Sequence, residues 1–544
     1  MQIKIKKTLI TTTAINLTIE MKRLIATGLI DLQDHNPIEV QGPIPTEEKE
    51  TKNYNMSKSK ISILIFFIFL SISAQNEVDA LRYSLFDNYS TARVSSLGGS
   101  FSALGGNTGS IISNPATLAT YRTNEFSASL MSSNENTRSK YLSENNNTDR
   151  HKLNFQNIGY IQTIPLEDAS GWKRFNYAIT YNRRADLNRR LSISGYNDQS
   201  TMANVFLNNA QGISVDSLYG PSDYLAYQTW LIDDTIGDGT YYSSIDQIGQ
   251  NQYAEISESG SIDDFDISAS GAYKDFLFIG ASITMSSINY SYQSRYLENG
   301  FNIKENDLEA WSYNENLYAT GFGLNFKIGA VIKPSYFLRL GWAYHSKTYY
   351  EIEESYDTNM SSWFLNDRDG DEVGPDYFYS DNYHPTAPFN LHTPSKAIGS
   401  LALIFAKHGL ITFDFETIDY SSANLSTIYH NEFQIANNNI ANLYQKTNNK
   451  KIGIEWKIQD ISFRAGYAAF GNPFKNELNN GEKEYISGGL GFQKGAYFFD
   501  IALINCLSEE NYILYNDPTL LDPAQSVEIT QSKKSLIVSC SYKF

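Results

Sequence analysis

The most constraining feature of this chain is a two-residue alternation of apolar and polar side chains that recurs from Phe126 to the C-terminus. Between Tyr318 and Ile328, large apolar residues alternate with small or polar ones, and segments 175–182 and 452–458 repeat the pattern. A period of two is that of a β-strand with two unlike faces. A soluble β-sandwich and a membrane β-barrel both satisfy this periodicity.

The connections between the alternating segments separate these two folds. Short links lie near 165–172, 273–274, 333–334, 407–409, 459–460 and 494–495, and long polar excursions lie near 132–151, 187–261, 291–311, 346–389, 420–446, 471–482 and 507–530. Strict interleaving of short turns with long loops is typical of outer-membrane barrels. The sequence therefore predicts an all-β fold, a fourteen-stranded antiparallel transmembrane β-barrel in the cell outer membrane of a Gram-negative bacterium, with both chain ends of the barrel on the periplasmic side.

The last strand of the chain supports the same fold. Leu536, Val538, Cys540 and Tyr542 alternate with polar or small residues, and the chain stops on the aromatic Phe544. A terminal aromatic residue on an alternating strand resembles the recognition signal of barrel-assembly machinery, which we therefore expect as a partner.

Composition excludes several function classes. The formal charge of −17 argues against a nucleic-acid partner, because phosphate binding needs a basic footprint. A mean hydropathy of −0.37 with one long apolar run excludes a bundle of transmembrane helices. The chain has no G-x-S-x-G, H-E-x-x-H or Cys/His cluster, so we expect neither an enzyme nor a cofactor.

The single apolar run, residues 61–70, has the order of a secretory signal peptide. Lysines precede it, and it ends in the small residues 71–74. It is too short to span a bilayer as a helix. We therefore expect residues 56–74 to be the signal peptide and residues 1–55 to lie upstream of the true translation start; the alternative is an internal anchor with a cytoplasmic tail.

Residues 75–123 do not alternate, and their glycines fit neither a P-loop nor a dinucleotide fingerprint. We expect this flexible, small-residue segment to fold into the barrel lumen as a hatch, with residues 124–544 forming the barrel. The residues expected to shape the hatch are Gly105, Gly106, Asn114 and Pro115. Proline restricts Asn114 to extended geometry, so the pair predicts a fixed turn before the first strand.

The hatch residues also carry a resemblance. Leu97-Gly98-Gly99-Ser100-Phe101 and Ser113-Asn114-Pro115-Ala116, with Leu391-His392-Thr393-Pro394 further on, resemble the FadL/TodX outer-membrane transport family, in particular its Bacteroidetes branch. The resemblance implies a hatch-plugged barrel for passive uptake of hydrophobic small molecules, such as long-chain fatty acid-like or aromatic compounds. The alternatives are a haemin-type receptor and a non-transporting surface or secretion-accessory barrel that binds a protein partner.

The polar faces of the predicted strands give the candidate lumen residues. These are Arg339, His345, Asp414, Glu416, Glu455, Arg464 and Asp500. Pairing among themselves or with the hatch is one interpretation, because a buried unpaired charge costs several kcal/mol. Direct contact with a ligand is the other, and a bound carboxylate would favour Arg339 or Arg464. Arginines 183, 184, 189 and 190 are expected to contact outer-membrane lipid and lipopolysaccharide, or to steer an anionic ligand.

The fourth long excursion is rich in aromatic residues. Trp363, Phe364, Tyr377, Phe378 and Tyr379 are expected to form an outer capture site for a hydrophobic ligand, or a core that holds the loop together. Three acidic residues in the same excursion stand at alternate positions around a glycine, as in calcium loops. They are Asp367, Asp369 and Asp371. The Glu that completes an EF-hand is missing, so a solvated acidic loop is the alternative.

Overall fold

The computed structural model describes residues 76–167, 171–301, 307–367, 376–385, 388–406, 408–427, 433–476, 479–517, 519–520 and 524–544, all in one compact unit. Among these residues, no helix has the length and apolarity needed to cross a bilayer. The segments expected as upstream sequence and signal peptide, 1–55 and 56–74, lie outside the described residues.

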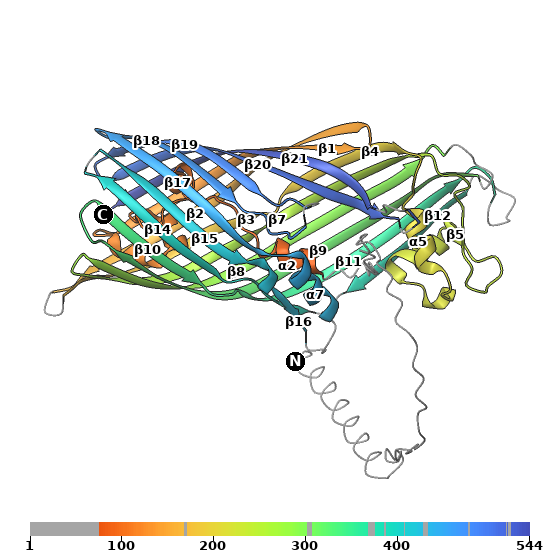
Figure 1. Ribbon diagram of the computed structural model, residues 1–544, viewed down its shortest axis with the longest axis horizontal. Coiled ribbons are helices and arrows are strands. Elements are labelled where there is room, and N and C mark those ends of the chain that lie inside the picture. Colours follow the sequence, from red (N-terminus) through yellow and green to blue (C-terminus); the bar gives the residue numbers. More distant parts are fainter. Residues whose placement is uncertain are drawn as a thin grey trace, which may run out of the picture. The chain divides into compact units, whose positions relative to one another are not determined.

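The described strands close into an antiparallel barrel (Figure 1). The strands are β1 (Glu125–Tyr141), β2 (Glu144–Pro165), β3 (Trp172–Asp186), β4 (Arg189–Asn197), β7 (Gln250–Tyr273), β8 (Leu277–Asn299), β9 (Leu308–Ile332), β10 (Leu338–His345), β11 (Tyr349–Phe364), β12 (Asp376–Pro385), β13 (Phe389–His392), β14 (Lys396–Phe405), β15 (Gly409–Asp419), β16 (Asn424–Ser426), β17 (Lys446–Ile458), β18 (Ile461–Phe470), β19 (Lys483–Lys494), β20 (Tyr497–Asn516) and β21 (Ala524–Lys543). Neighbouring strands pair in antiparallel orientation, and β21 pairs with β1 to close the barrel.

Interruptions within single barrel strands explain the larger number of labelled segments. β3 and β4 both pair with β7, β10 and β11 both pair with β9, and β15 and β16 follow one line beside β14 and β13. Taken with its interruptions, the barrel has fourteen strands, as the connection pattern predicts.

The two faces of each strand meet different surroundings. On β9, Phe322, Leu324, Phe326 and Ile328 are 44–59% exposed on the outside, whereas Asn325 and Lys327 are buried inside. An outward apolar surface of this kind needs a bilayer to cover it. The barrel is therefore that of a bacterial outer-membrane protein.

The strands reach well beyond the membrane, which corrects the expected loop boundaries. β1 and β2 are joined at Leu142-Ser143, so the predicted excursion 132–151 is almost entirely strand. β7, β8 and β9 have 24, 23 and 25 residues, whereas a bilayer needs about 9–11. Periodicity failed there because strands standing in water are polar on their outer face, and a polar strand resembles a loop.

The N-terminal segment is helical rather than flexible and irregular. It contains α2 (Glu77–Arg82), α3 (Ala92–Ser96), α4 (Thr108–Ser113) and the 3₁₀-helix η1 (Pro115–Thr120). Its helices contact opposite parts of the barrel wall, since η1 packs on β7–β9 and α3 packs on β18–β21. Sequence periodicity missed them because helices of five or six residues are too short to show a 3.6-residue pattern.

Glycines in the wall let the hatch approach closely. A Cβ on Gly466 of β18 would lie 2.0 Å from the backbone nitrogen of Gly98, and one on Gly453 of β17 would lie 2.5 Å from the carbonyl oxygen of Leu97. Gly98 itself has a φ of +64°, which only glycine adopts without strain. The small-residue composition of the hatch thus serves its packing against backbone.

The second long excursion folds into a cap over the outer mouth of the barrel. It contains α5 (Ala203–Ala210), the short turns η2 (Val215–Ser217) and η3 (Gly220–Tyr224), α6 (Leu225–Gln228), β5 (Ile232–Asp233) and β6 (Tyr242–Ser243), drawn in yellow in Figure 1. Phe206 of the cap packs edge-on against Trp311 and Tyr313 of β9. Further along, η4 (Tyr420–Ser422) and α7 (Gln434–Leu443) connect β15 with β17.

Candidate functional site

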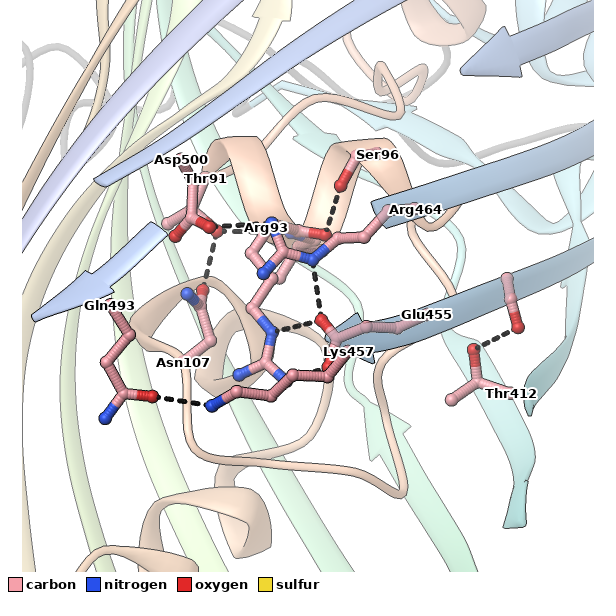
Figure 2. A network of polar contacts seen from close by, with 12 residues as sticks. Thr91, Arg93, Ser96, Asn107, Thr412, Glu455, Lys457, Arg464, Gln493 and Asp500 are labelled. Atoms are coloured by element: carbon pink, nitrogen blue, oxygen red, sulfur yellow. Dashed lines mark hydrogen bonds and ion pairs between the residues drawn. The ribbon is translucent and has the colours of Figure 1, made fainter. Parts of the chain in front are cut away.

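The hatch is tied to the barrel wall by a network of buried charges (Figure 2). Arg93 of α3 donates from Nε and Nη2 to the two oxygens of Glu455, each at 2.9 Å. Arg464 bridges Glu455 and Asp500, with 2.6 Å to an oxygen of each. Burial lowers the Arg93 pKa, but the Glu455 carboxylate more than offsets this, and the pKa lies above its ordinary value. The predicted residues Glu455, Arg464 and Asp500 thus form one cluster.

Asp414 and Glu416, neighbours on β15, have different partners. Asp414 accepts the backbone N–H groups of Phe101 and Ser102, at 3.2 and 3.1 Å, and so holds the hatch loop after α3. Glu416 accepts from Lys451 of β17 at 2.7 Å and is buried. Asp414 is therefore an anchor for the hatch, whereas Glu416 belongs to the wall.

Arg339 and His345 of β10 both reach the hatch backbone. Arg339 donates to the carbonyl of Leu104, and His345 Nε2 donates to the carbonyl of Ser113 at 2.9 Å. Every predicted lumen residue therefore contacts either the hatch or another wall residue. This arrangement favours the structural-pairing interpretation for Arg464, whose guanidinium is already occupied by two carboxylates.

The Asn114-Pro115 pair forms a turn at the start of η1. Asn114 has extended geometry, with φ −145° and ψ 106°, and its Oδ1 accepts the backbone N–H of Ala116 at 3.0 Å. Its Nδ2 donates to the carbonyl of Ser102 at 2.8 Å, which joins two parts of the hatch. Gly105 and Gly106 lie between Ser102 and Asn114, and both have positive φ, 74° and 76°.

A cavity of about 130 Å³ lies between the hatch and the wall. Phe86 and Ile112 of the hatch line it, together with Arg184, Lys396 and Glu416 of the barrel. Lys396 Nζ lies 4.1 Å from the ring centroid of Phe86. Lys396 also attracts the Glu416 carboxylate in the same cavity, although no ion pair of Lys396 within 4 Å is found in the described part of the chain. The cavity is thus partly apolar, with a cation facing it.

The barrel wall has an unpaired seam beside this cavity. β2 pairs with β3 only from Asn157 to Pro165, and β4 pairs with β7 instead of β2. Side chains bridge the rest: Gln156 donates to the carbonyl of Arg183 at 2.9 Å, and Arg150 donates to the carbonyls of Arg189 and Glu258. We define the β2–β4 seam as this stretch, from Gln156 outward to Glu144, because no backbone ladder crosses it between these described strands.

The predicted arginine cluster divides between two faces. Arg183 pairs with Asp263 at 3.0 Å, Arg184 donates to Tyr350 at 2.5 Å, and Arg189 pairs with Glu510. Arg190 alone points outward and is exposed. Four arginines close in sequence therefore do not form one basic patch, because strand alternation and the bulge near Arg183 send them to different neighbours.

The aromatic excursion also divides. Phe364 is 1% exposed and packs on Phe378, which also contacts Trp230 of the cap, so these two belong to a core. Tyr377 and Tyr379 are 55% and 53% exposed on the other face of the β11–β12 hairpin, and the Trp363 ring lies beside that of Tyr377 at an angle of 43°. Of the possible calcium ligands, Asp369 and Asp371 lie outside the described residues. Within those described, no group of acidic or His/Cys side chains is arranged to hold a metal.

Several contacts that position the site left no sequence signal. Arg93 lies in the non-alternating segment, so nothing indicated that it points at Glu455. Lys327 and Asp266 form a buried pair at 2.7 Å between strands that are not neighbours along the chain. Arg150 falls in the segment 132–151, where the sequence pattern predicts a loop. Pairwise strand register would have been needed to find them.

Comparison with known proteins shows the fold. A FadL homologue from Pseudomonas aeruginosa aligns over 85% of this chain and 100% of its own, with TM-score 0.50 and 12% identity. The toluene transporter TodX of P. putida aligns over 84% of this chain and 98% of its own, with TM-score 0.49 and 14% identity. The monoaromatic hydrocarbon channel CymD aligns over 85% of this chain and 99% of its own, with TM-score 0.46 and 12% identity. No protein-family description and no curated protein sequence matches the chain.

Proposed function

We propose that this protein is an outer-membrane channel for passive uptake of small hydrophobic molecules. The observation that carries the proposal is the position of the cavity, between a hatch and the end of an unpaired seam in the wall. Asn182 and Arg184 of β3 line the cavity, and Arg183 between them accepts the last side-chain bridge from β2. Only the thickness of the barrel wall at this strand therefore separates a molecule in the cavity from the bilayer.

The seam favours passage over a purely structural role. Backbone groups in a lipid-facing wall are normally paired across the strands, since each unsatisfied group in hydrocarbon costs several kcal/mol. At the membrane end of the seam Gln156 replaces the ladder to Arg183 of β3, and further outward Arg150 joins β2 to Arg189 of β4. Breaking a few side-chain hydrogen bonds therefore separates β2 from both strands. Leu153 and Phe155, 68% and 58% exposed, flank the seam on its outer side and offer an apolar exit into the membrane.

The lining of the cavity favours an amphipathic cargo within this class. Phe86, Val94 and Ile112 supply apolar contact, whereas Lys396 and Arg184 are cations. A compound with an apolar body and an acidic group matches both parts, because Lys396 can pair with the acid. A fatty acid-like molecule fits this description better than an unsubstituted hydrocarbon.

Mass spectrometry of compounds that co-purify with the protein tests the proposal, followed by uptake into proteoliposomes. We expect a fluorescent long-chain carboxylate to enter faster than it does in protein-free vesicles, and a sugar of similar mass to be excluded. Equal rates with and without the protein, together with capture of a defined surface protein, would instead support the non-transporting barrel. Lys396→Gln should slow the carboxylate but not its methyl ester.

A further inference from the structure

We propose that a basic cleft on the outer wall binds the phosphate groups of a phosphorylated glycolipid in the outer leaflet. The cleft lies among β2, β4, β7 and β8 and has a volume of about 540 Å³, compared with about 130 Å³ for the cavity beside the hatch. Its charged lining consists of Arg150, Lys152, Arg190 and Arg295, with Asp149 and Glu255. Nothing in the proposed uptake function requires this site.

Strand register explains why these residues gather. Arg190 of β4 lies opposite Ser257 of β7, which lies opposite Gln293 of β8. In the next row toward the outer end of the barrel, Arg295 of β8 lies opposite Glu255 of β7. Because β2 is not bonded to β4, the wall is not flat there. Thr148 reaches across the gap to the carbonyl of Arg190 at 2.7 Å, which brings β2 beside the two arginine rows.

The cleft presents cations that the protein itself leaves unpaired. Arg190 and Arg295 are exposed, and no ion pair of Arg190, Arg295 or Lys152 is found among the residues that the structure describes. Asp149 accepts a hydrogen bond from Asn136 at 3.0 Å. Four permanent cations thus face two carboxylates on a chain with a formal charge of −17. A local excess of positive charge on an acidic protein marks an anion-binding surface.

The position of the cleft along the barrel axis indicates which kind of anion it binds. On β2, the lipid-facing residues Phe155 and Leu153 are followed directly by the cleft residues Lys152 to Asp149. Headgroup phosphates of the outer leaflet lie at this boundary, where clustered Arg and Lys bind anionic lipid. The fork of an arginine also matches a phosphate with two hydrogen bonds. Leu153 and Phe155 supply the contact for the acyl chains that a free phosphate lacks.

Binding of lipid A to the detergent-purified protein tests this inference. Native mass spectrometry would compare diphosphorylated lipid A, monophosphorylated lipid A and inorganic phosphate. The variant is Arg190→Gln with Arg295→Gln, which leaves the seam residue Arg150 in place. The control is Arg122→Gln with Lys494→Gln, two exposed cations at the opposite, periplasmic end of the barrel that remove the same charge.

We expect the cleft variant to bind diphosphorylated lipid A roughly tenfold or more weakly than the unaltered protein, since each basic group near a membrane contributes to anionic lipid binding. The control should bind as the unaltered protein does, and loss of one lipid phosphate should weaken binding less in the variant. Heat-modifiable gel migration confirms that both variants fold. Equal weakening in variant and control, or displacement of the lipid by millimolar inorganic phosphate, would overturn the proposal.

Discussion

Arg93 of the hatch holds Glu455 of the barrel wall with two parallel hydrogen bonds of 2.9 Å. This fork is the main ionic connection between α3 and β17, and Glu455 also accepts from Arg464 at 2.6 Å. Removing Arg93 therefore leaves the wall pair in place and releases only the hatch. The geometry makes Arg93 the residue with which to test whether the hatch seals the lumen.

Arg93→Gln should loosen the hatch without unfolding the barrel. The lost charge-assisted hydrogen bonds cost about 1–3 kcal/mol of hatch attachment. We expect higher ion conductance in planar bilayers and faster hydrogen exchange of the α3 amides. Lys140→Gln is the control, because its pair with Glu528 is exposed at the rim and contributes little. Unchanged conductance with faster α3 exchange would show that the hatch does not seal the lumen.

Pro115→Ala should also raise passage of small solutes, through a different part of the hatch. Proline fixes the first residue of η1, and Asn114 before it ties η1 to the loop at Ser102. Alanine keeps the contacts but removes the conformational restriction, so the turn gains entropy when it opens. A liposome leakage assay measures the effect, with Pro165→Ala at the end of β2 as the control. Identical leakage in the two variants would remove this element from any gating role.

The cap should respond to pH through Asp223 of η3. Among the residues that the structure describes, this buried carboxylate accepts hydrogen bonds from Ser222 and Asn209, and burial raises its pKa to about 6 from an ordinary value near 3.8. The folded cap therefore binds this proton more tightly than the unfolded cap does. Its stability is greatest below the ordinary pKa and falls as pH rises from about 4 to about 6.

Asp223→Asn should abolish that dependence and make the cap more resistant to proteolysis at pH 7. Limited proteolysis of residues 198–249 at pH 4, 5, 6 and 7 measures it. Asp216→Asn, a change at an exposed position in the same segment, is the control. If both variants keep the pH dependence of the unaltered protein, another group is responsible.

Much of the barrel was readable from sequence because its faces differ in polarity. Strands β9 and β21 alternate so regularly that the pattern predicts which of their residues face lipid, among them Phe322 and Val538. The sequence pattern does not predict the fold of the cap or the parts of the strands that extend beyond the membrane. Residues of β2 such as Thr148 and Arg150 stand in water on one side and beside a polar seam on the other, so no alternation marks them.

The candidate site shows the same division. Inward orientation of Asp414, Glu455 and Arg464 follows from period two. Their partners do not, because a hatch of short helices can present any residue to any strand. Arg93 and Phe101 reach β17 and β15 across more than three hundred residues of chain. These contacts depend on the position of the hatch inside the barrel, and no local sequence pattern encodes that position.

The seam gives a further prediction that depends on the proposed uptake function. Arg150→Gln removes the donor that joins β2 to the carbonyls of Arg189 and Glu258. We expect uptake of a fluorescent long-chain carboxylate into proteoliposomes to rise about twofold or more, because fewer hydrogen bonds oppose separation of the strands. Arg138→Gln on the exposed outer face of β1 should leave uptake unchanged. Slower uptake in Arg150→Gln would mean that the seam does not open.

The two cysteines test the register of the last strands. In the structure both are free, Cys506 buried and Cys540 exposed. Cys506 lies opposite Lys533 and Cys540 opposite Phe499, seven residues apart along β20, which is roughly 23 Å at strand spacing. A disulfide tolerates a Cα separation of about 7 Å. We therefore expect membrane-permeant maleimides to label Cys540 in intact cells and charged maleimides not to. Peptide mapping after a non-reducing digest should recover both thiols unlinked, and a Cys506–Cys540 linked peptide would contradict the facing of both strands.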